Sequence, residues 1–150
     1  MVVRLQGNMI RYTTSLDGIT PEMLSGFFVG WPNPPSQETH LRILQNSSFV
    51  VLAIDEQAGL VVGFIAAVSD GIMSAYISML EVLPAHQRKG IGTELVRRML
   101  EQCGKLYMVD TTCDDHLRPF YAWCGMRPST GMMIRNYERQ SGDIEGGRAP

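Results

Sequence analysis

The spacing of apolar residues changes several times along the chain, which predicts a domain of mixed strands and helices. Residues 9–12 alternate like a short edge strand, and residues 49–54 form a compact apolar run. Residues 60–68 are apolar at nearly every position, so both faces of that strand should be covered. Asp70-Gly71 is a turn signal, and a further strand is expected at about 75–82.

Helical patterns occupy the segments between these strands. Pro21 opens a predicted helix over 21–29, and Ser36 caps a second one that runs to about residue 46. The clearest helix follows Gly92, where an apolar stripe lies opposite Arg97 and Arg98. The stripe consists of Leu95, Val96, Met99, Leu100 and Cys103.

The rest of the pattern completes a single α/β domain with a mixed sheet. We expect a strand at 106–109, a short helix at 117–123 and a last strand at 130–134, giving the order β-α-α-β-β-β-α-β-α-β. The domain is assigned to 9–139. Residues 1–8 are set aside as an N-terminal extension, and residues 140–150, rich in glycine and poor in apolar residues, are expected to form a flexible tail.

Composition narrows the class of protein. The chain has 150 residues, 45% of them apolar, and a formal net charge of −2, so it is neither disordered nor a general nucleic-acid binder. It contains no apolar stretch that could span a membrane and no N-terminal signal core. Three cysteines without a C-x-x-C pair indicate reduced thiols, and we expect a cytoplasmic protein without a metal site.

The segment with the most chemical information runs from the strand at 75–82 into the helix after Gly92. It is a short basic loop with two glycines, and residues 84–105 hold five basic residues against two acidic ones. Glycines let the backbone approach a ligand, and the first N–H groups of a helix have no intrahelical partners. Together with Arg88 and Lys89 they make an anion site suited to a phosphate or pyrophosphate.

Known phosphate motifs restrict the ligand. A dinucleotide fingerprint needs a third glycine at position 95, which is Leu95, and the chain has no P-loop. The alternative to a phosphate site is a glycine-containing turn between strand and helix whose basic face is only solvated.

Two motifs resemble the GNAT-type N-acetyltransferases. The run Gln87-Arg88-Lys89-Gly90-Ile91-Gly92 is similar to the family's acetyl-coenzyme A (acetyl-CoA) signature, and the preceding run from Leu80 to Pro84 is similar to the strand that leads into it. About 30 residues after Gly92, the run from Phe120 to Met126 resembles the second landmark of the family, an aromatic-Tyr pair followed by Gly and an apolar residue. The resemblance covers about residues 9–137 and implies a GNAT-like fold.

The resemblance also implies roles for individual residues. Main-chain groups of Leu80 and Val82 would bind the acetyl carbonyl and the pantetheine arm, and Tyr121 matches the usual general acid. Asp114 stands where many members have an asparagine that contacts the cofactor, and a carboxylate cannot donate the hydrogen bond of that amide. The side chains of Gln87 and Arg88 would help to hold the pyrophosphate. Its main contacts would be the N–H groups of Arg88, Lys89, Gly90, Ile91, Gly92 and Thr93.

The reaction implied is direct attack of a primary amine on the thioester through a tetrahedral intermediate. A lysine-like amine has a pKa of ~10.4, so only ~0.04% is neutral at pH 7 and a base is needed. Glu81 is the first candidate, and Asp110 or a water path are the alternatives. Strand alternation puts Glu81 opposite Leu80 and Val82, although a bulge would reverse the face it uses.

Plainer interpretations of these residues stay open. Tyr121 could be a core aromatic, and Glu81 could be half of a surface ion pair. A silent acyl-CoA-binding module is the alternative function, and a phosphate track of Arg88, Lys89, Arg97 and Arg98 would instead indicate nucleic-acid binding. The sequence does not identify the small-molecule or peptide amine acceptor. Many relatives pair as homodimers, so the resemblance allows a homodimer here.

Overall fold

A six-stranded sheet forms the centre of the computed structural model, which describes residues 2–5 and 7–143. Neighbouring strands are antiparallel, except that β5 and β6 are parallel and are joined by the crossover helix α2 (Ile91–Gln102). Across the sheet the strands are β1 (Val2–Leu5), β2 (Asn8–Thr13), β3 (Phe49–Asp55), β4 (Leu60–Ser69), β5 (Ser74–Val82) and β6 (Met108–Thr111).

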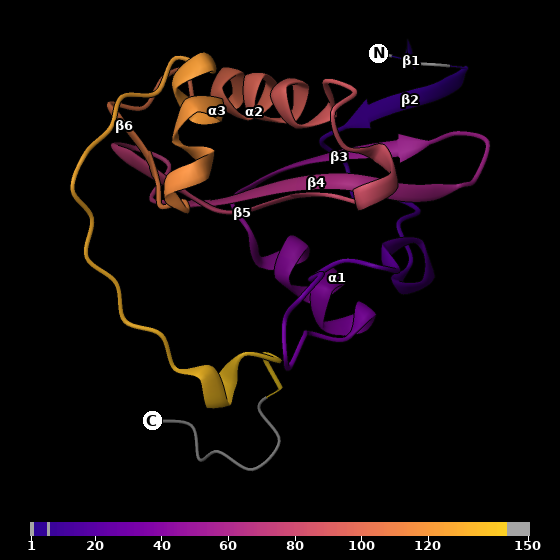
Figure 1. Cartoon of the computed structure of the whole chain (residues 1–150), viewed down its shortest axis with the longest axis horizontal. Helices are drawn as coiled ribbons and strands as arrows, with labels where there is room; N and C mark the ends of the chain where they lie inside the picture. The colour runs from indigo at the N-terminus through magenta and orange to yellow at the C-terminus, as the bar shows by residue number, and fades with distance from the viewer. Residues whose placement is uncertain (1, 6, 144–150) are drawn as a thin grey trace.

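Helices cover both faces of this sheet (Figure 1). α2 and α3 (Arg118–Trp123) lie on one face, where Leu95, Val96 and Met99 are fully buried. α1 (Gln37–Asn46) and the short 3-10 helix η1 (Pro21–Leu24) lie on the other face. Further 3-10 turns are η2 (Pro84–His86), η3 (Asp115–Leu117) and η4 (Tyr137–Arg139).

Local sequence signals correctly predicted the mixed α/β class and most of these elements. The predicted strands at 49–54, 60–68 and 75–82 all form, and every residue of β4 from Val61 to Ala67 is buried. Ser36 is the N-cap of α1, where its Oγ accepts a hydrogen bond from the Thr39 N–H at 3.1 Å. The strand expected at 106–109 forms two residues later, as β6.

The N-terminal segment belongs to the sheet, which corrects its exclusion from the fold. β1 pairs antiparallel with β2 in a hairpin whose register runs from Val2 opposite Arg11 to Leu5 opposite Asn8. Residue 7 is a glycine with a φ of 92°, a left-handed conformation that suits a tight turn. The segment was too short and too weakly patterned to be recognised without its partner strand.

The helix predicted over 21–29 ends at Leu24. The chain then adopts left-handed φ angles at Gly26 (89°), Phe28 (62°) and Gly30 (80°). A right-handed helix cannot pass through such residues, so the segment becomes a loop over 26–31. The side chains of Phe28 and Leu24 are nevertheless buried, because the loop closes over the α1 side of the sheet.

The strand predicted at 130–134 does not form. After α3 the chain runs without regular structure to η4, standing away from the body of the molecule (Figure 1). A strand exists only where a neighbour supplies hydrogen bonds, and this segment has none among the described residues. The first residue of the predicted tail contacts the rest of the protein, because the Gln140 side chain accepts a hydrogen bond from the Asn33 N–H at 3.0 Å. Residues 144–150 of that tail lie outside the described part of the chain.

His40 on α1 is a buried histidine in an aromatic environment. Its ring is 4.4 Å from that of Phe64 and 4.9 Å from that of Phe28, measured between centroids. Neither ring nitrogen has a hydrogen-bond partner among the residues that the structure describes. Burial lowers the pKa of His40 from 6.5 to about 4, because a charged imidazolium would lose its hydration there.

This burial predicts acid sensitivity. The pKa of His40 is lower in the folded state than in the unfolded state, so the unfolded chain binds the proton more readily. Stability is therefore retained above pH 6.5 and lost as the pH falls towards 4, by about 3 kcal/mol in total. Urea unfolding of the wild type and His40→Leu should show this loss only in the wild type. Exposed His116→Gln is the control, and parallel pH curves for wild type and His40→Leu would contradict the prediction.

Candidate active site

The parallel strands β5 and β6 are paired over only part of their length. Their register runs from Ser74 opposite Met108 to Ile77 opposite Thr111 and then stops. β5 nevertheless continues to Val82, still paired with β4 on its other side. Over residues 78–82 the edge of β5 that faces β6 therefore has no strand partner among the described residues.

A bulge sets the direction of each side chain along this open edge. The β4–β5 register shifts between Ala66 and Ala67, so that Ile77 and Leu80 both pack against the core on the α2 side. Glu81 is thereby directed to the opposite face. The Leu83 N–H bonds to β4, at the Val62 carbonyl, and hydrogen-bonding direction alternates along a strand.

From this alternation it follows that the main-chain groups of Leu80 and Val82 point to the unpaired side of β5. The Val82 carbonyl is consistent with this direction, because it accepts a hydrogen bond from Gln87 Nε2 at 2.9 Å rather than from β4. A linear ligand with amide groups could thus bind to β5 as an added strand.

Glu81 holds the 26–31 loop against the sheet. Its Oε2 accepts from the Phe28 N–H at 2.9 Å, and its Oε1 accepts from the Val29 N–H at 3.1 Å. Because Phe28 is a non-glycine residue with a φ of 62°, its backbone is strained and needs support from its surroundings. The sequence offered no sign of this contact, which joins residues more than fifty positions apart.

The turn between β5 and α2 has the shape expected of an anion site. Arg88 has a φ of 58°, and Gly90, the N-cap of α2, has a φ of 82°. Where right-handed and left-handed residues alternate along a turn, successive main-chain N–H groups point to the same side and form a concave anion site. The helix begins at Ile91, and its first main-chain bond is donated by Glu94 to the Gly90 carbonyl at 3.1 Å. The earlier N–H groups of the helix are left for an external acceptor.

Two side chains of this turn stabilise the turn itself. Gln87 binds the Val82 carbonyl, as described, and Lys89 Nζ donates to the Ala85 carbonyl at 3.0 Å. The prediction that the Gln87 side chain helps to hold a pyrophosphate is therefore not supported by its position. A Cβ at Gly92 would lie 3.5 Å from Phe120 Cζ and 3.8 Å from Val82 Cγ2, which are ordinary contact distances, so packing does not require a glycine there.

Tyr121 on α3 lies in the same apolar cluster as Leu80 and Val82. Its side chain is buried, and the Phe120 ring packs edge-on against it at 5.0 Å between centroids. Burial raises the pKa of Tyr121 to about 12, while a hydrogen bond with Thr111 acts in the opposite direction. The phenol is therefore protonated at neutral pH and available there as a donor of a proton or a hydrogen bond.

The two aspartates proposed from sequence lie on the β6 side. Asp110 is within β6, opposite Tyr76 on β5, and Asp114 precedes η3, where its carbonyl accepts from the Leu117 N–H at 2.9 Å. Asp114 is exposed, and no contact joins it to the β5–α2 turn in the described part of the chain. The structure thus brings Leu80, Val82 and Tyr121 together but leaves Asp114 apart.

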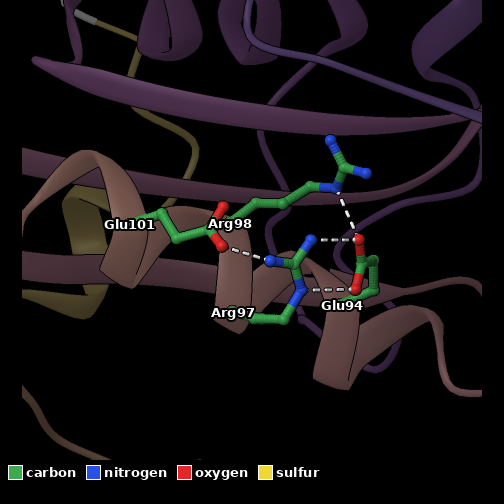
Figure 2. Close-up of polar contacts among 4 residues, drawn as sticks. All are labelled: Glu94, Arg97, Arg98 and Glu101. Carbon is green, nitrogen blue, oxygen red and sulfur yellow. Dashed lines mark hydrogen bonds and ion pairs between the residues drawn. The ribbon is translucent and has the colours of Figure 1, made fainter. Parts of the chain in front are cut away.

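Arg97 and Arg98 are engaged in an ion-pair network on α2 (Figure 2). Glu94 bonds to Arg97 at 2.7 Å and to Arg98 at 2.7 Å, and Arg97 also pairs with Glu101. These hydrogen bonds, that from Arg97 above all, lower the pKa of Glu94 to about 2. Arg98 also lies over the Tyr12 ring at 4.8 Å. Two of the four cations considered for a phosphate track are thus already paired with acids on the same helix.

An open cleft of about 490 Å³ lies between α2 and α3, and the sequence did not predict it. It starts at Thr93 in the first turn of α2, and the exposed ring of Trp123 forms part of its wall.

Within residues 2–5 and 7–143, no group of three or more His, Cys, Asp or Glu side chains could hold a metal ion. In the same residues no helix has the length and apolar character to cross a membrane.

Comparison with known proteins agrees with this geometry. The profile of the acetyltransferase (GNAT) family matches residues 16–126. A crystal structure from Deinococcus radiodurans R1, of a protein described as an acetyltransferase, is 45% identical with a TM-score of 0.87 and covers 94% of this chain and 97% of that one. A GNAT-family acetyltransferase from Streptococcus pneumoniae is 29% identical with a TM-score of 0.67, covering 91% and 98%.

A curated relative is the chloroplastic GCN5-related N-acetyltransferase 3 of Arabidopsis thaliana. It is 39% identical over an alignment of 87 positions, and the match covers 53% of this chain and 37% of the relative. The chain thus spans little more than a third of the length of that protein. The sheet separates between β5 and its edge strand β6, beside the N-terminus of α2. The chain belongs to the acetyltransferase (GNAT) family.

Proposed function

We propose that this protein is an acetyl-CoA-dependent N-acetyltransferase that transfers an acetyl group to a primary amine. One observation carries the proposal: the unpaired edge of β5 at residues 78–82 leads directly into the left-handed turn at Arg88 and Gly90. An extended amide-containing arm followed by a pyrophosphate matches such an edge and such a turn in order and in chemistry. Acetyl-CoA has that composition, and the family membership supports acetyl transfer.

The proposed binding mode uses main-chain groups. Leu80 and Val82 would bond to the pantetheine arm, and N–H groups over 88–93 would bond to the pyrophosphate, with the charge of Arg88 beside them. Gln87 would act indirectly by fixing the Val82 carbonyl. The cleft that begins at Thr93 offers space for the far end of the cofactor. No observation supports a cofactor contact from Asp114, so we leave it out of the proposed set.

The chemistry proposed is direct attack on the thioester. The amine nitrogen forms a bond to the acetyl carbon, the negative charge moves to the carbonyl oxygen, and the C–S bond then breaks. The Leu80 N–H would stabilise the oxygen, and Tyr121 would donate to the departing sulfur. Glu81, on the α1 side of the same strand, would take the amine proton through lone pairs that its two main-chain bonds leave free.

A silent acyl-CoA-binding module is the second candidate. It is favoured by the use of Glu81 as an anchor for the 26–31 loop, a role that needs no catalysis. The two functions differ in one observable, because only the enzyme releases free thiol when amines are supplied. Both would be cytoplasmic in our proposal, given three free cysteines.

Calorimetric titration with acetyl-CoA tests the cofactor site. We expect binding by the wild type and a loss of affinity of at least about a hundredfold in Gly90→Val, because a branched residue cannot hold the left-handed N-cap and two charged hydrogen bonds would be lost. Gly71→Val is the matched control. Its φ of 73° and open surroundings resemble the 82° and open surroundings of Gly90, but it lies in the β4–β5 turn at the other end of β5.

Three outcomes are informative. Selective binding that Gly90→Val abolishes and Gly71→Val retains would support the site, and thiol release with a panel of amines would then separate the enzyme from the silent module. Equal loss in both variants would indicate general destabilisation. Wild-type protein that binds dephospho-CoA and NAD as well as acetyl-CoA would contradict the proposed selectivity, and unchanged affinity in Gly90→Val would refute the turn as the phosphate site.

A further inference from the structure

Thr111 occupies the point where β5 and β6 separate. It is the last residue of β6, and its partner in the register, Ile77, is the last residue of β5 that pairs with β6. The Thr111 hydroxyl donates a hydrogen bond to the Ile77 carbonyl at 3.0 Å. A side chain of β6 therefore binds the main chain of β5 at the last paired position, immediately before the unpaired edge at residues 78–82.

The side chain of Thr111 lies on the face of the sheet that α2 and α3 cover. Val109, two residues earlier in β6, packs against the core on that face, and side chains two positions apart in a strand share a face. Tyr121 on α3 belongs to the same core. The hydrogen bond between Thr111 and Tyr121 thus connects the point of strand separation to the phenol of the proposed proton donor.

The direction of each hydrogen bond follows from the groups that make it. A carbonyl can only accept, so the single proton of the Thr111 hydroxyl is directed to Ile77. The oxygen of that hydroxyl still has lone pairs, and at neutral pH the protonated phenol of Tyr121 donates to one of them. Thr111 thereby fixes the position of the phenolic oxygen beside the unpaired edge of β5.

The same hydroxyl can also stabilise the ionised form of Tyr121. A phenolate only accepts hydrogen bonds, so once its proton has left, the Thr111 proton can turn from the Ile77 carbonyl to the phenolate oxygen. The pKa of Tyr121 reflects this contact: burial and the neighbouring thiol of Cys113 raise the pKa, whereas the hydrogen bond with Thr111 lowers it. Thr111 therefore favours release of a proton that the apolar surroundings of the phenol retain.

We propose that Thr111 is a positioning residue for acetyl transfer: its hydroxyl orients the Tyr121 phenol at the opening between β5 and β6 and donates to the phenolate after the proton has moved to the departing sulfur. The inference rests on the proposed function, in which Tyr121 is the donor. In this step the O–H bond of Tyr121 breaks, and the S–H bond of the thiol forms with the electron pair that the broken C–S bond leaves on sulfur. The negative charge passes to the phenolic oxygen, and water then returns a proton to it.

Steady-state kinetics of Thr111→Val and Thr111→Ser test the role of the hydroxyl. Valine keeps the branched shape of the side chain without the hydroxyl, and serine keeps the hydroxyl without the methyl group. We expect Thr111→Val to lower kcat by roughly thirtyfold, since a hydrogen bond to a charged group contributes about that factor. The KM for the amine and the affinity for acetyl-CoA should change little, and Thr111→Ser should restore most of the wild-type kcat.

Thr112→Val is the matched control. The Thr112 hydroxyl also bonds across these two strands, to the Tyr76 hydroxyl at 2.6 Å. Tyr76 precedes Ile77 in β5 and therefore points to the opposite face of the sheet, away from the core that contains Tyr121. Thr112→Val thus removes a comparable contact between the strands and should leave kcat unchanged.

A double-mutant cycle separates positioning of Tyr121 from general support of the sheet. In a Tyr121→Phe background the Thr111 hydroxyl has no phenol to act on, so Thr111→Val should cause little further loss of kcat. An equal loss in both backgrounds, a wild-type kcat in Thr111→Val, or a failure of Thr111→Ser to restore activity would each overturn the proposal while wild-type thiol release leaves the proposed function intact. A wild type that releases no thiol with the amine panel would overturn both.

Discussion

Replacing Tyr121 with Phe is expected to lower turnover about a hundredfold while acetyl-CoA affinity stays nearly unchanged, because one positioned donor to a developing charge contributes about that factor. The ring remains to pack among the apolar side chains, so little structure is lost. Only the hydroxyl that would meet the departing sulfur is removed. Thiol release with a reactive amine and calorimetric titration with acetyl-CoA measure the two effects separately.

The raised pKa of Tyr121 adds a pH prediction. With a pKa of about 12, the phenol keeps its proton through the physiological range, so no loss of activity from its ionisation is expected until the solution approaches that pH. Tyr107→Phe, at an exposed tyrosine, is the matched control and should leave turnover unchanged. Full activity of Tyr121→Phe would remove Tyr121 as the donor and would favour the binding module.

Replacing Glu81 with Gln is expected to have two effects at once. If the carboxylate takes the amine proton, kcat falls by roughly a hundredfold or more, as for other positioned bases. The amide also presents an NH₂ group to one of the two N–H donors that the carboxylate binds, at Phe28 or Val29. Losing one hydrogen bond to a charged group costs about 2 kcal/mol, so the melting temperature should fall by several degrees.

Kinetics separate the two roles of Glu81. A pure anchor would raise the KM for the amine, by loosening the 26–31 loop, and would leave kcat at saturating amine intact. A base would lower kcat. Glu38→Gln, an exposed carboxylate on α1 on the same side of the sheet, controls for the change of charge. A variant Glu81→Gln with unchanged stability would show that the two main-chain contacts do not hold the loop in solution.

Most of the fold could be predicted because its signals are local. The Ser36 cap, the continuous apolar run of β4 and the stripe on α2 each depend on residues within a few positions of one another. The β5–α2 turn was recognisable for the same reason, since left-handed Gly90 and the first turn of α2 are adjacent. The family resemblance placed these elements in one sheet, and the topology agrees.

The predictions that were wrong failed because they depend on contacts between distant parts of the chain or on neighbouring side chains. The strand expected at 130–134 and the hairpin partner missed at Val2–Leu5 both depend on whether a neighbouring strand is present. Helical periodicity over 21–29 was overridden at Gly26 and Phe28, where the loop turns to meet Glu81 from a distant strand. Arg97 and Arg98, which looked like a free basic face, are neutralised by acids on the same helix.

The sequence by itself determined the α/β class and the position of the turn between β5 and α2, because these rest on short-range patterns. Tyr121 became the candidate acid through the family resemblance, and that role stays a prediction. Only the tertiary structure decided that β5 separates from β6 after Ile77, that Glu81 anchors the 26–31 loop, and that residues 130–134 remain unpaired. Those features depend on which strands meet and in what register. Such contacts join residues tens of positions apart and leave no periodic trace along the chain.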